Sequence, residues 1–194
     1  MNQDADIIVV GGGLVGVAAA VSLAREGLAV IHLAPTAPPD RRTSALMLPS
    51  VDFLLESGLV SDPATIGHKL SEIRIIDATS RLIRAPETLF KAEEAGLPAF
   101  GWNFANARLL EHFQAARPET GLTTRAEAVT AYRREGDLGV VVLSDGSELR
   151  APLVVGADGK KSLIRSATGI TTREHNFDEA ALVCDLDLSR SIGG

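Results

Sequence analysis

Short apolar runs alternate with amphipathic stretches in the first part of the chain. Residues 6–10 are almost all apolar and β-branched, which is typical of a strand buried on both faces of a parallel sheet. Apolar residues then recur at helical spacing over residues 14–26, and Gly27 supplies the glycine that commonly follows the end of a helix. A second buried strand is predicted over residues 29–33. Together the three segments predict a βαβ unit of ordinary size.

The middle of the chain carries a weaker pattern. The proline-rich residues 34–40 predict a loop, and a helical pattern follows over residues 49–58. Residues 73–76 and 82–84 are largely apolar and flank a polar turn, so they predict an antiparallel hairpin. Residues 106–116 form a clearer amphipathic pattern, which predicts a helix.

The last part of the chain is rich in short β segments. They are predicted at residues 126–132, 138–143, 148–149, 153–155 and 181–188. Asp145-Gly146 is a strong hairpin-turn signal between two of them. A short helix is expected over residues 162–168, closed by Gly169. Strands that alternate with helices early, followed by hairpins later, indicate an α/β fold.

Composition and charge narrow the classes of function. The chain has 194 residues, of which 45% are apolar and 23% charged, a balance that suits one globular domain or part of a larger one. The net charge of −6 argues against a nucleic-acid partner, because a phosphate backbone attracts a basic surface. One bound nucleotide is still compatible with it, since a helix N-terminus can hold phosphate. A single cysteine, Cys184, and four scattered histidines predict no metal site and an intracellular protein without internal disulfides.

One segment has the length of a membrane span. Residues 7–24 carry no charge and number 18, the lower limit for a spanning helix. Glycines crowd the middle of this run, however, and Asp4 and Asp6 precede it where a signal peptide needs basic residues. A strand, a glycine turn and a helix explain the run better, so we predict no integral membrane segment.

The first motif that carries chemistry is Gly11-x-Gly13-x-x-Gly16. It follows a predicted strand and opens a predicted helix, which is the context of a dinucleotide-binding fingerprint. In that fingerprint Gly11 allows the tight turn, Gly13 lets a pyrophosphate approach the helix N-terminus, and Gly16 lets helix and strand pack closely. A glycine turn with no ligand is the less favoured interpretation.

One part of the fingerprint is missing. An acidic residue is expected at the end of the second strand, where it binds the ribose hydroxyls of the nucleotide. Ala34 stands at that position, and the nearest downstream carboxylate is Asp40, beyond three prolines. Either ribose binding is weakened, or His32 or a group of the loop substitutes.

The second motif is Gly156-Ala157-Asp158-Gly159, between a predicted buried strand and a short helix. Its glycines would let a ligand approach the backbone, and the Asp158 carboxylate could accept hydrogen bonds from ligand hydroxyls. An equally good interpretation is that Asp158 caps the following helix, a common use of aspartate.

The order of these two motifs resembles that of the FAD-dependent aromatic-ring monooxygenases of the para-hydroxybenzoate hydroxylase type. In that family the first motif binds the ADP part of FAD, and the Asp-Gly motif contacts FAD and serves the use of NAD(P)H. Arg42 resembles an arginine that lies near FAD, and Asn106 or Arg108 resembles a polar residue beside the flavin. The resemblance implies the following cofactor-binding residues: Gly11, Gly13, Leu14, Val15, Gly16, Arg42, Asn106, Arg108, Val129, Asp158 and Gly159. It assigns no catalytic side chain and no metal ligand.

The detailed sequence is most similar to the ubiquinone-biosynthesis branch of this family. Residues 42–46 (Arg-Thr-Ser-Ala-Leu) and 100–103 (Phe-Gly-Trp-Asn) carry that similarity. It implies hydroxylation of a small aromatic, and potentially prenylated, ring with NAD(P)H and O2. It also implies a cytoplasmic protein, with peripheral contact to a membrane left open.

The resemblance implies a Rossmann-like FAD-binding domain with a parallel central sheet, an antiparallel β-meander and the start of a substrate-domain sheet. We assign residues 1–72 and 100–178 to the FAD-binding domain, and 73–99 and 179–194 to partial substrate-domain segments. Family members are about twice as long, so the chain is interpreted as an N-terminal portion. Two alternatives stay open: an FAD- or nucleotide-binding fragment without turnover, and a flavin-dependent reductase or halogenase on the same fold.

Overall fold

A parallel sheet forms the centre of the molecule in the computed structural model, which describes residues 3–177 and 189. The predicted βαβ unit is confirmed as β1 (Ile7–Val10), α1 (Leu14–Arg25) and β2 (Val30–Leu33). Strands β12 (Leu153–Gly156) and β8 (Leu122–Arg125) extend it to a four-stranded parallel sheet in the order β12-β1-β2-β8. This order brings the strands that precede the two glycine motifs, β1 and β12, next to each other.

The other elements fall into an antiparallel part and three further helices. The remaining strands are β3 (Thr43–Met47), β4 (Gly67–Leu70), β5 (Glu72–Ile75), β6 (Thr88–Lys91), β7 (Gly101–Ala105), β9 (Val129–Glu135), β10 (Leu138–Leu143) and β11 (Glu148–Ala151). The helices are α2 (Leu48–Glu56), α3 (Asn106–Ala115) and α4 (Leu163–Ala167), with single 3₁₀ turns at Pro63–Thr65 and Ala92–Ala95.

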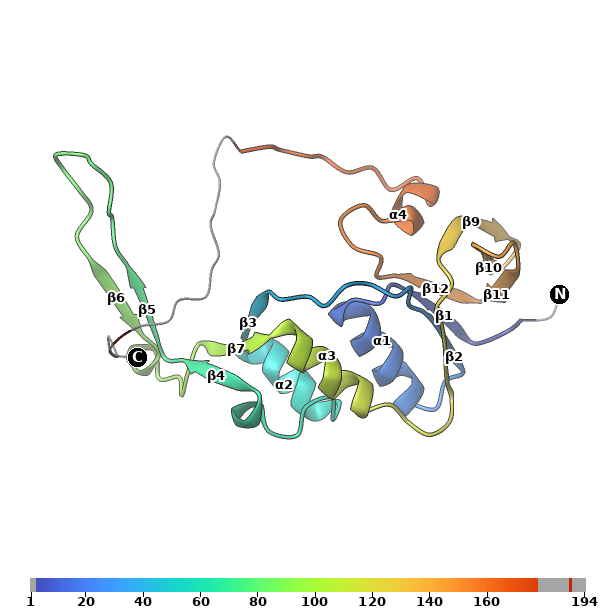
Figure 1. Cartoon of the computed structure of the whole chain (residues 1–194), viewed down its shortest axis with the longest axis horizontal. Coiled ribbons are helices and arrows are strands. Elements are labelled where there is room, and N and C mark those ends of the chain that lie inside the picture. Colours follow the sequence, from blue (N-terminus) through green and yellow to red (C-terminus); the bar gives the residue numbers. More distant parts are fainter. Residues whose placement is uncertain (1–2, 178–188, 190–194) are drawn as a thin grey trace.

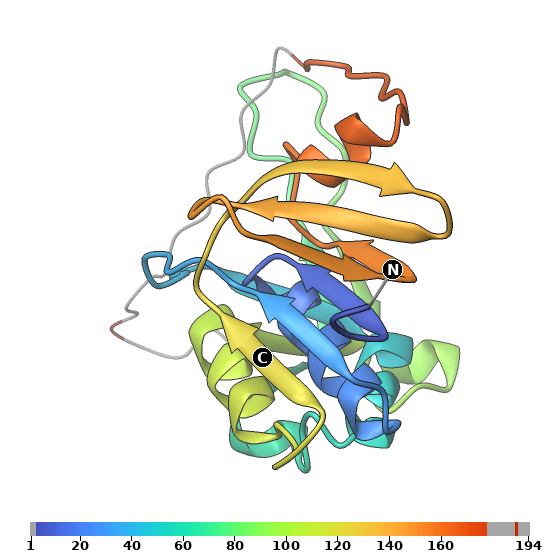
Figure 2. The ribbon, with the colours of Figure 1, turned by 90° about the vertical axis from the view of Figure 1, so that its right-hand side faces the viewer.

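The parallel sheet is covered on both faces. Successive side chains of a strand point to opposite faces, and β1 shows the result. Ile8 and Val10 pack with the antiparallel meander β11-β10-β9 and with α4, whereas Ile7 and Val9 pack with α1. Figure 2 shows the meander as a layer across one side of the parallel sheet. The continuous apolar run of β1 is therefore explained by burial on both faces, as the sequence predicted.

A second core lies where α1, α2 and α3 meet. The buried side chains of Val21, Leu54, Phe104 and Leu109 pack together there, so that α1 contacts apolar groups on two sides. This packing holds the N-terminal ends of α1 and α3 close to each other. The cavity described below is bordered by both helices.

The predicted hairpin exists, but its second strand was wrongly placed. Strand β5 pairs with β6, with Ile73 opposite Phe90, and residues 82–84 lie in the loop between them. The Asp77 carboxylate accepts hydrogen bonds from the backbone N–H groups of Thr79 and Ala85, which closes this loop on itself. Leu82 and Ile83 are exposed, because no strand among the described residues pairs with this part of the loop. In Figure 1 the hairpin extends away from the helices.

Several strands have no counterpart in the sequence prediction. Strands β3 and β4 flank β7 in an antiparallel sheet, and β8 precedes the predicted strand 126–132, which begins three residues later as β9. The strand predicted at 181–188 and almost all of the segment 179–194 lie outside the described residues. The division into two domains therefore stays a prediction.

Candidate nucleotide-binding site

The three glycines of the first motif have different surroundings. Gly11 has φ +129°, and a Cβ added there would overlap the backbone carbonyl of Ala157. A Cβ at Gly16 would overlap the carbonyl oxygen of Gly11. A Cβ at Gly13, by contrast, would meet no atom within 4 Å. Gly11 and Gly16 thus make close packing between strand, turn and helix possible, and Gly13 leaves open space in front of the helix.

The N-terminus of α1 has free hydrogen-bond donors. The first N–H groups of an α-helix have no partner within the helix. Gly13 is the N-cap residue, and no side chain among residues 3–177 caps the helix, whose first turn holds no acidic residue. The unmatched donors and the helix dipole together favour an anion at this end.

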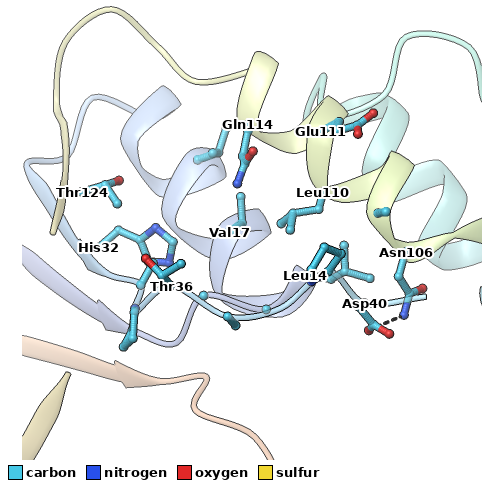
Figure 3. A pocket seen from close by; sticks show the side chains of 18 of the residues that line it. Leu14, Val17, His32, Thr36, Asp40, Asn106, Leu110, Glu111, Gln114 and Thr124 are labelled. Atoms are coloured by element: carbon cyan, nitrogen blue, oxygen red, sulfur yellow. Dashed lines mark hydrogen bonds between the residues drawn. The ribbon is translucent and has the colours of Figure 1, made fainter. Parts of the chain in front are cut away.

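These donors face a cavity of about 530 Å³. It is bordered by the β1–α1 turn, the end of β2, the loop 34–40 and one side of α3, with Leu14, His32, Asp40, Asn106 and Leu110 among its lining residues (Figure 3). A neighbouring hollow of about 350 Å³ is lined by Val15, Arg42 and Gly159, among others. Gly13, Leu14, Asp40 and Asn106 line both. The two hollows therefore form one continuous surface along the start of α1.

A polar network joins the loop after β2 to the start of α3. The Asn106 amide nitrogen donates to the Asp40 carboxylate at 2.8 Å, and its oxygen accepts from the Ser44 hydroxyl at 2.6 Å. The Arg42 guanidinium contacts both carboxylate oxygens of Asp40, each at 2.8 Å. The bonds from Arg42 and Asn106 hold the pKa of Asp40 well below its usual range. The network fixes Arg42 and Asn106, both of them predicted site residues, relative to each other.

The sequence pattern gave no indication that Asp40 and Ser44 take part in this network. Asp40 lies 66 residues before Asn106 in the chain, so no local pattern shows the contact. The one local signal is the spacing of Asp40 and Arg42, which are two residues apart and form an ion pair.

His32 lies beneath the glycine turn. Its side chain is buried, and Nε2 is 2.8 Å from the carbonyl oxygen of Gly11. A carbonyl oxygen only accepts hydrogen bonds, so we infer that Nε2 carries the proton. Burial lowers the pKa of His32, and the positive charge of Arg117 lowers it further, against the opposing effect of the Gly11 hydrogen bond. The imidazole is therefore neutral near pH 7.

The second motif contacts its own helix. Oδ2 of Asp158 accepts hydrogen bonds from the backbone N–H groups of Leu163 at 2.7 Å and Ile164 at 3.3 Å. The Ser162 hydroxyl accepts from the Arg165 N–H at 3.0 Å. Burial opposes ionisation of Asp158, but the hydrogen bonds it accepts outweigh that effect and hold its pKa below the usual range. The capping contacts considered in the sequence analysis are thus present in the structure.

Two further predicted site residues lie away from both hollows. Arg108 is exposed on α3 and lines neither of them. Val129 begins β9 and packs against the core between the parallel sheet and the meander. The other predicted residues lie at the β1–α1 and β12–α4 turns and at the start of α3, except Arg42. That residue lies between β2 and β3, where its carbonyl oxygen accepts from the Asn106 N–H. The cofactor-binding roles of all of them stay predictions.

A parallel sheet with a glycine turn, a free helix N-terminus and a long cavity beside it defines a dinucleotide-binding α/β domain. The residues at this site suit the pyrophosphate of a dinucleotide but lack the usual partner of its ribose. Gly13 leaves room for a pyrophosphate, whereas the carboxylate that usually meets the ribose is replaced by Ala34.

Comparison with known proteins agrees with this class. Residues 4–191 match the FAD binding domain family. The chain belongs to this family. It is 33% identical to the ubiquinone hydroxylase UbiL of Rhodospirillum rubrum over all of this chain and 46% of the relative. It is 31% identical to 3-demethoxyubiquinol 3-hydroxylase of Escherichia coli over 99% of this chain and 51% of the relative. The chain therefore spans about half the length of these two relatives.

Solved structures show the same fold. The p-nitrophenol 4-monooxygenase PnpA from Pseudomonas putida DLL-E4 superposes with a TM-score of 0.72 at 23% identity, over 88% of this chain and 45% of that protein. Among residues 3–177 and 189, no helix has the length and apolar character that crossing a membrane requires.

Proposed function

We propose that this chain is the FAD-binding portion of a monooxygenase that hydroxylates an aromatic ring with NAD(P)H and O2. The observation that carries the proposal is the uncapped start of α1, which faces the cavity across the open space at Gly13. Membership of the FAD binding domain family supports the choice of FAD among dinucleotides. The names of the relatives, two ubiquinone hydroxylases at 31–33% identity, support a ring-hydroxylation step of ubiquinone biosynthesis.

Different residues of the site would bind different parts of FAD. The N–H groups of Leu14, Val15 and Gly16 would hold the pyrophosphate, because they are the free donors of α1. Gly11 acts through packing, since it has no space for a ligand of its own. Arg42 and Asn106, fixed by Asp40, would orient the part of FAD that extends along the second hollow past Gly159.

Roles for Arg108, Val129 and Asp158 rest on the resemblance alone. Arg108 and Val129 line neither hollow, and Asp158 is engaged with α4. When bound, FAD supplies the redox chemistry, accepting a hydride from NAD(P)H and activating O2. We further propose a small aromatic substrate, prenylated rings included, and a cytoplasmic protein that can contact a membrane peripherally.

A titration with FAD tests the cofactor step. The purified chain is titrated while flavin fluorescence and the visible spectrum are recorded, with a Gly13→Asp variant as the control. Saturable binding that this variant loses would support the proposal, whereas no binding by a folded wild-type chain would contradict it. Ring hydroxylation is tested separately, by measuring NAD(P)H oxidation together with a hydroxylated product.

A second candidate function is nucleotide binding without turnover. Ala34 favours it, because a site that lacks the ribose-binding carboxylate can hold the cofactor too weakly to sustain a catalytic cycle. FAD binding in the absence of any NAD(P)H-dependent product would favour this candidate over the first.

A further inference from the structure

The cavity must recognise a ribose without the usual acid if it holds a dinucleotide. Ala34 follows β2 directly, and side chains two residues apart on an extended strand point to the same side. His32 therefore lies on the same face of β2 as Ala34, the face that α1 covers. Both residues line the large cavity, and Figure 3 labels His32 on its wall.

His32 has one nitrogen engaged and one available. Nε2 donates to the Gly11 carbonyl, which fixes the ring, and in this neutral tautomer Nδ1 is a hydrogen-bond acceptor. Within the described part of the chain Nδ1 has no hydrogen-bond partner, although the side chain is only 3% exposed. An acceptor without a partner on the wall of a cavity is suited to a hydroxyl donor from a ligand.

The other polar groups of the cavity wall are less suited to that role. Both oxygens of Asp40 are bonded to Arg42 and Asn106. Thr36 belongs to the exposed loop 34–40, and Thr124 receives a hydrogen bond from Arg117. Glu111 and Gln114 are exposed on α3. His32 is thus the acceptor that the surrounding structure holds most firmly in place.

We infer that His32 replaces the missing carboxylate and accepts a hydrogen bond from a hydroxyl of the adenosine ribose through Nδ1. The inference rests on the proposed binding of FAD and adds a specificity-determining residue to it. A neutral imidazole nitrogen accepts one hydrogen bond, whereas a carboxylate accepts two. The site therefore still binds a ribose hydroxyl, but more weakly than a site with a carboxylate.

The test compares two nucleotides that differ only in the ribose. Calorimetric titrations with ADP and with 2′,3′-dideoxy-ADP are carried out on the whole chain. We expect the wild-type chain to bind ADP about five- to tenfold more tightly, the factor that one ordinary hydrogen bond contributes. Equal binding of the two nucleotides would overturn the inference.

Two substitutions separate the ribose contact from the structural contact of His32. In His32→Gln the side-chain amide reaches as far as Nε2 and can keep the bond to Gly11, but no acceptor remains at the position of Nδ1. In His32→Asn an oxygen can stand near the position of Nδ1, while the bond to Gly11 is lost. We expect the preference for ADP to fall to about one in the Gln variant and to persist in part in the Asn variant. An unchanged preference in His32→Gln would overturn the inference.

An Ala34→Glu variant distinguishes the failure of this inference from the failure of the proposed function. If the wild-type chain binds neither FAD nor ADP while Ala34→Glu binds both, the cradle is a dinucleotide site and the role of His32 is refuted. If a folded Ala34→Glu variant also binds neither nucleotide, the proposed FAD binding fails together with the inference.

Discussion

Two strand–turn–helix corners lie side by side in this molecule, and they use their helix ends in different ways. β1 leads into α1 through Gly11–Gly13, and β12 leads into α4 through Gly156–Ser162, with the two strands paired in parallel. Both turns are rich in glycine. In the first, no side chain of the described part of the chain caps the helix, whereas in the second Asp158 and Ser162 accept hydrogen bonds from the first N–H groups.

The difference shows what makes a glycine turn a phosphate site. Glycine makes close approach possible, but the anion also needs donors that the protein leaves free. Helix α1 has twelve residues and free donors, whereas α4 has five residues and uses its donors internally. The first corner therefore leaves donors for a ligand, whereas the second uses its donors on Asp158 and Ser162.

The largest effect is expected at Gly16. Its replacement by Ala places a methyl group on the Gly11 carbonyl oxygen, so that the first corner must open. We expect Gly16→Ala to lower the free energy of unfolding by about 3 kcal/mol, the upper end for overpacking. Urea denaturation measures it, with Gly13→Ala as the control, because that methyl group meets no atom within 4 Å. Equal stability of the two variants would contradict the packing role.

Gly13→Asp separates binding from stability within the same corner. A carboxylate there stands where the phosphate is proposed to lie, and like charges in a partly closed site repel by a few kcal/mol. We expect FAD affinity to fall by about a hundredfold or more. Aspartate is a good N-cap residue, so the free energy of unfolding should stay constant or rise slightly. Retained affinity in a folded variant would show that the phosphate does not meet this helix end.

The second corner is tested by Asp158→Ala. This change removes the acceptor of two backbone N–H groups, so we expect the free energy of unfolding to fall by about 1–2 kcal/mol, as for other capping residues. Its effect on FAD affinity should be smaller than that of Gly13→Asp. The opposite result, in which affinity is lost and stability is kept, would show that Asp158 serves the ligand rather than α4.

The fold could be predicted from the sequence where the pattern is local, and not where it depends on long-range pairing. Strand β1 and helix α1 were predicted well because their patterns are local and each buries a continuous apolar surface. The hairpin partner of β5 was misplaced because register depends on a pairing across a long loop. Residues 82–84 were apolar enough to be taken for a strand, yet β6 at Thr88–Lys91 is the partner.

The candidate site likewise has a part that the sequence predicts and a part that only the structure shows. The glycine fingerprint is a local motif, and its three positions have the surroundings that their roles require. The network of Ser44, Asn106 and Asp40 joins residues more than 60 positions apart, so it depends on the long-range pairing of β3 with β7, which places Thr43 opposite Ala105. The sequence also left two interpretations of Asp158 equally open, and its contacts with α4 are visible in the structure alone.

The smallest expected effect is the dependence of stability on pH. The two corners differ in the pH at which each begins to lose its contribution to the free energy of unfolding. His32 in the first corner has its pKa lowered from 6.5, so below that pH the unfolded chain takes up a proton that the folded chain resists. Asp158 in the second corner has its pKa lowered from 3.8, so its contribution is kept until the pH falls below about 4. The first corner should therefore weaken at a higher pH than the second.

Urea denaturation at a series of pH values from about 7.5 to about 5 measures the loss of stability that is due to His32. We expect the free energy of unfolding to fall more steeply with falling pH in the wild-type chain than in His32→Gln, which has no titrating group at this position. Arg117, Glu111 and Asp40 line the same cavity and are unchanged in both chains, so they cancel in the comparison. Parallel curves would mean that His32 takes up its proton as readily in the folded chain as in the unfolded one. In that case its hydrogen bond to Gly11 would not depend on the neutral ring.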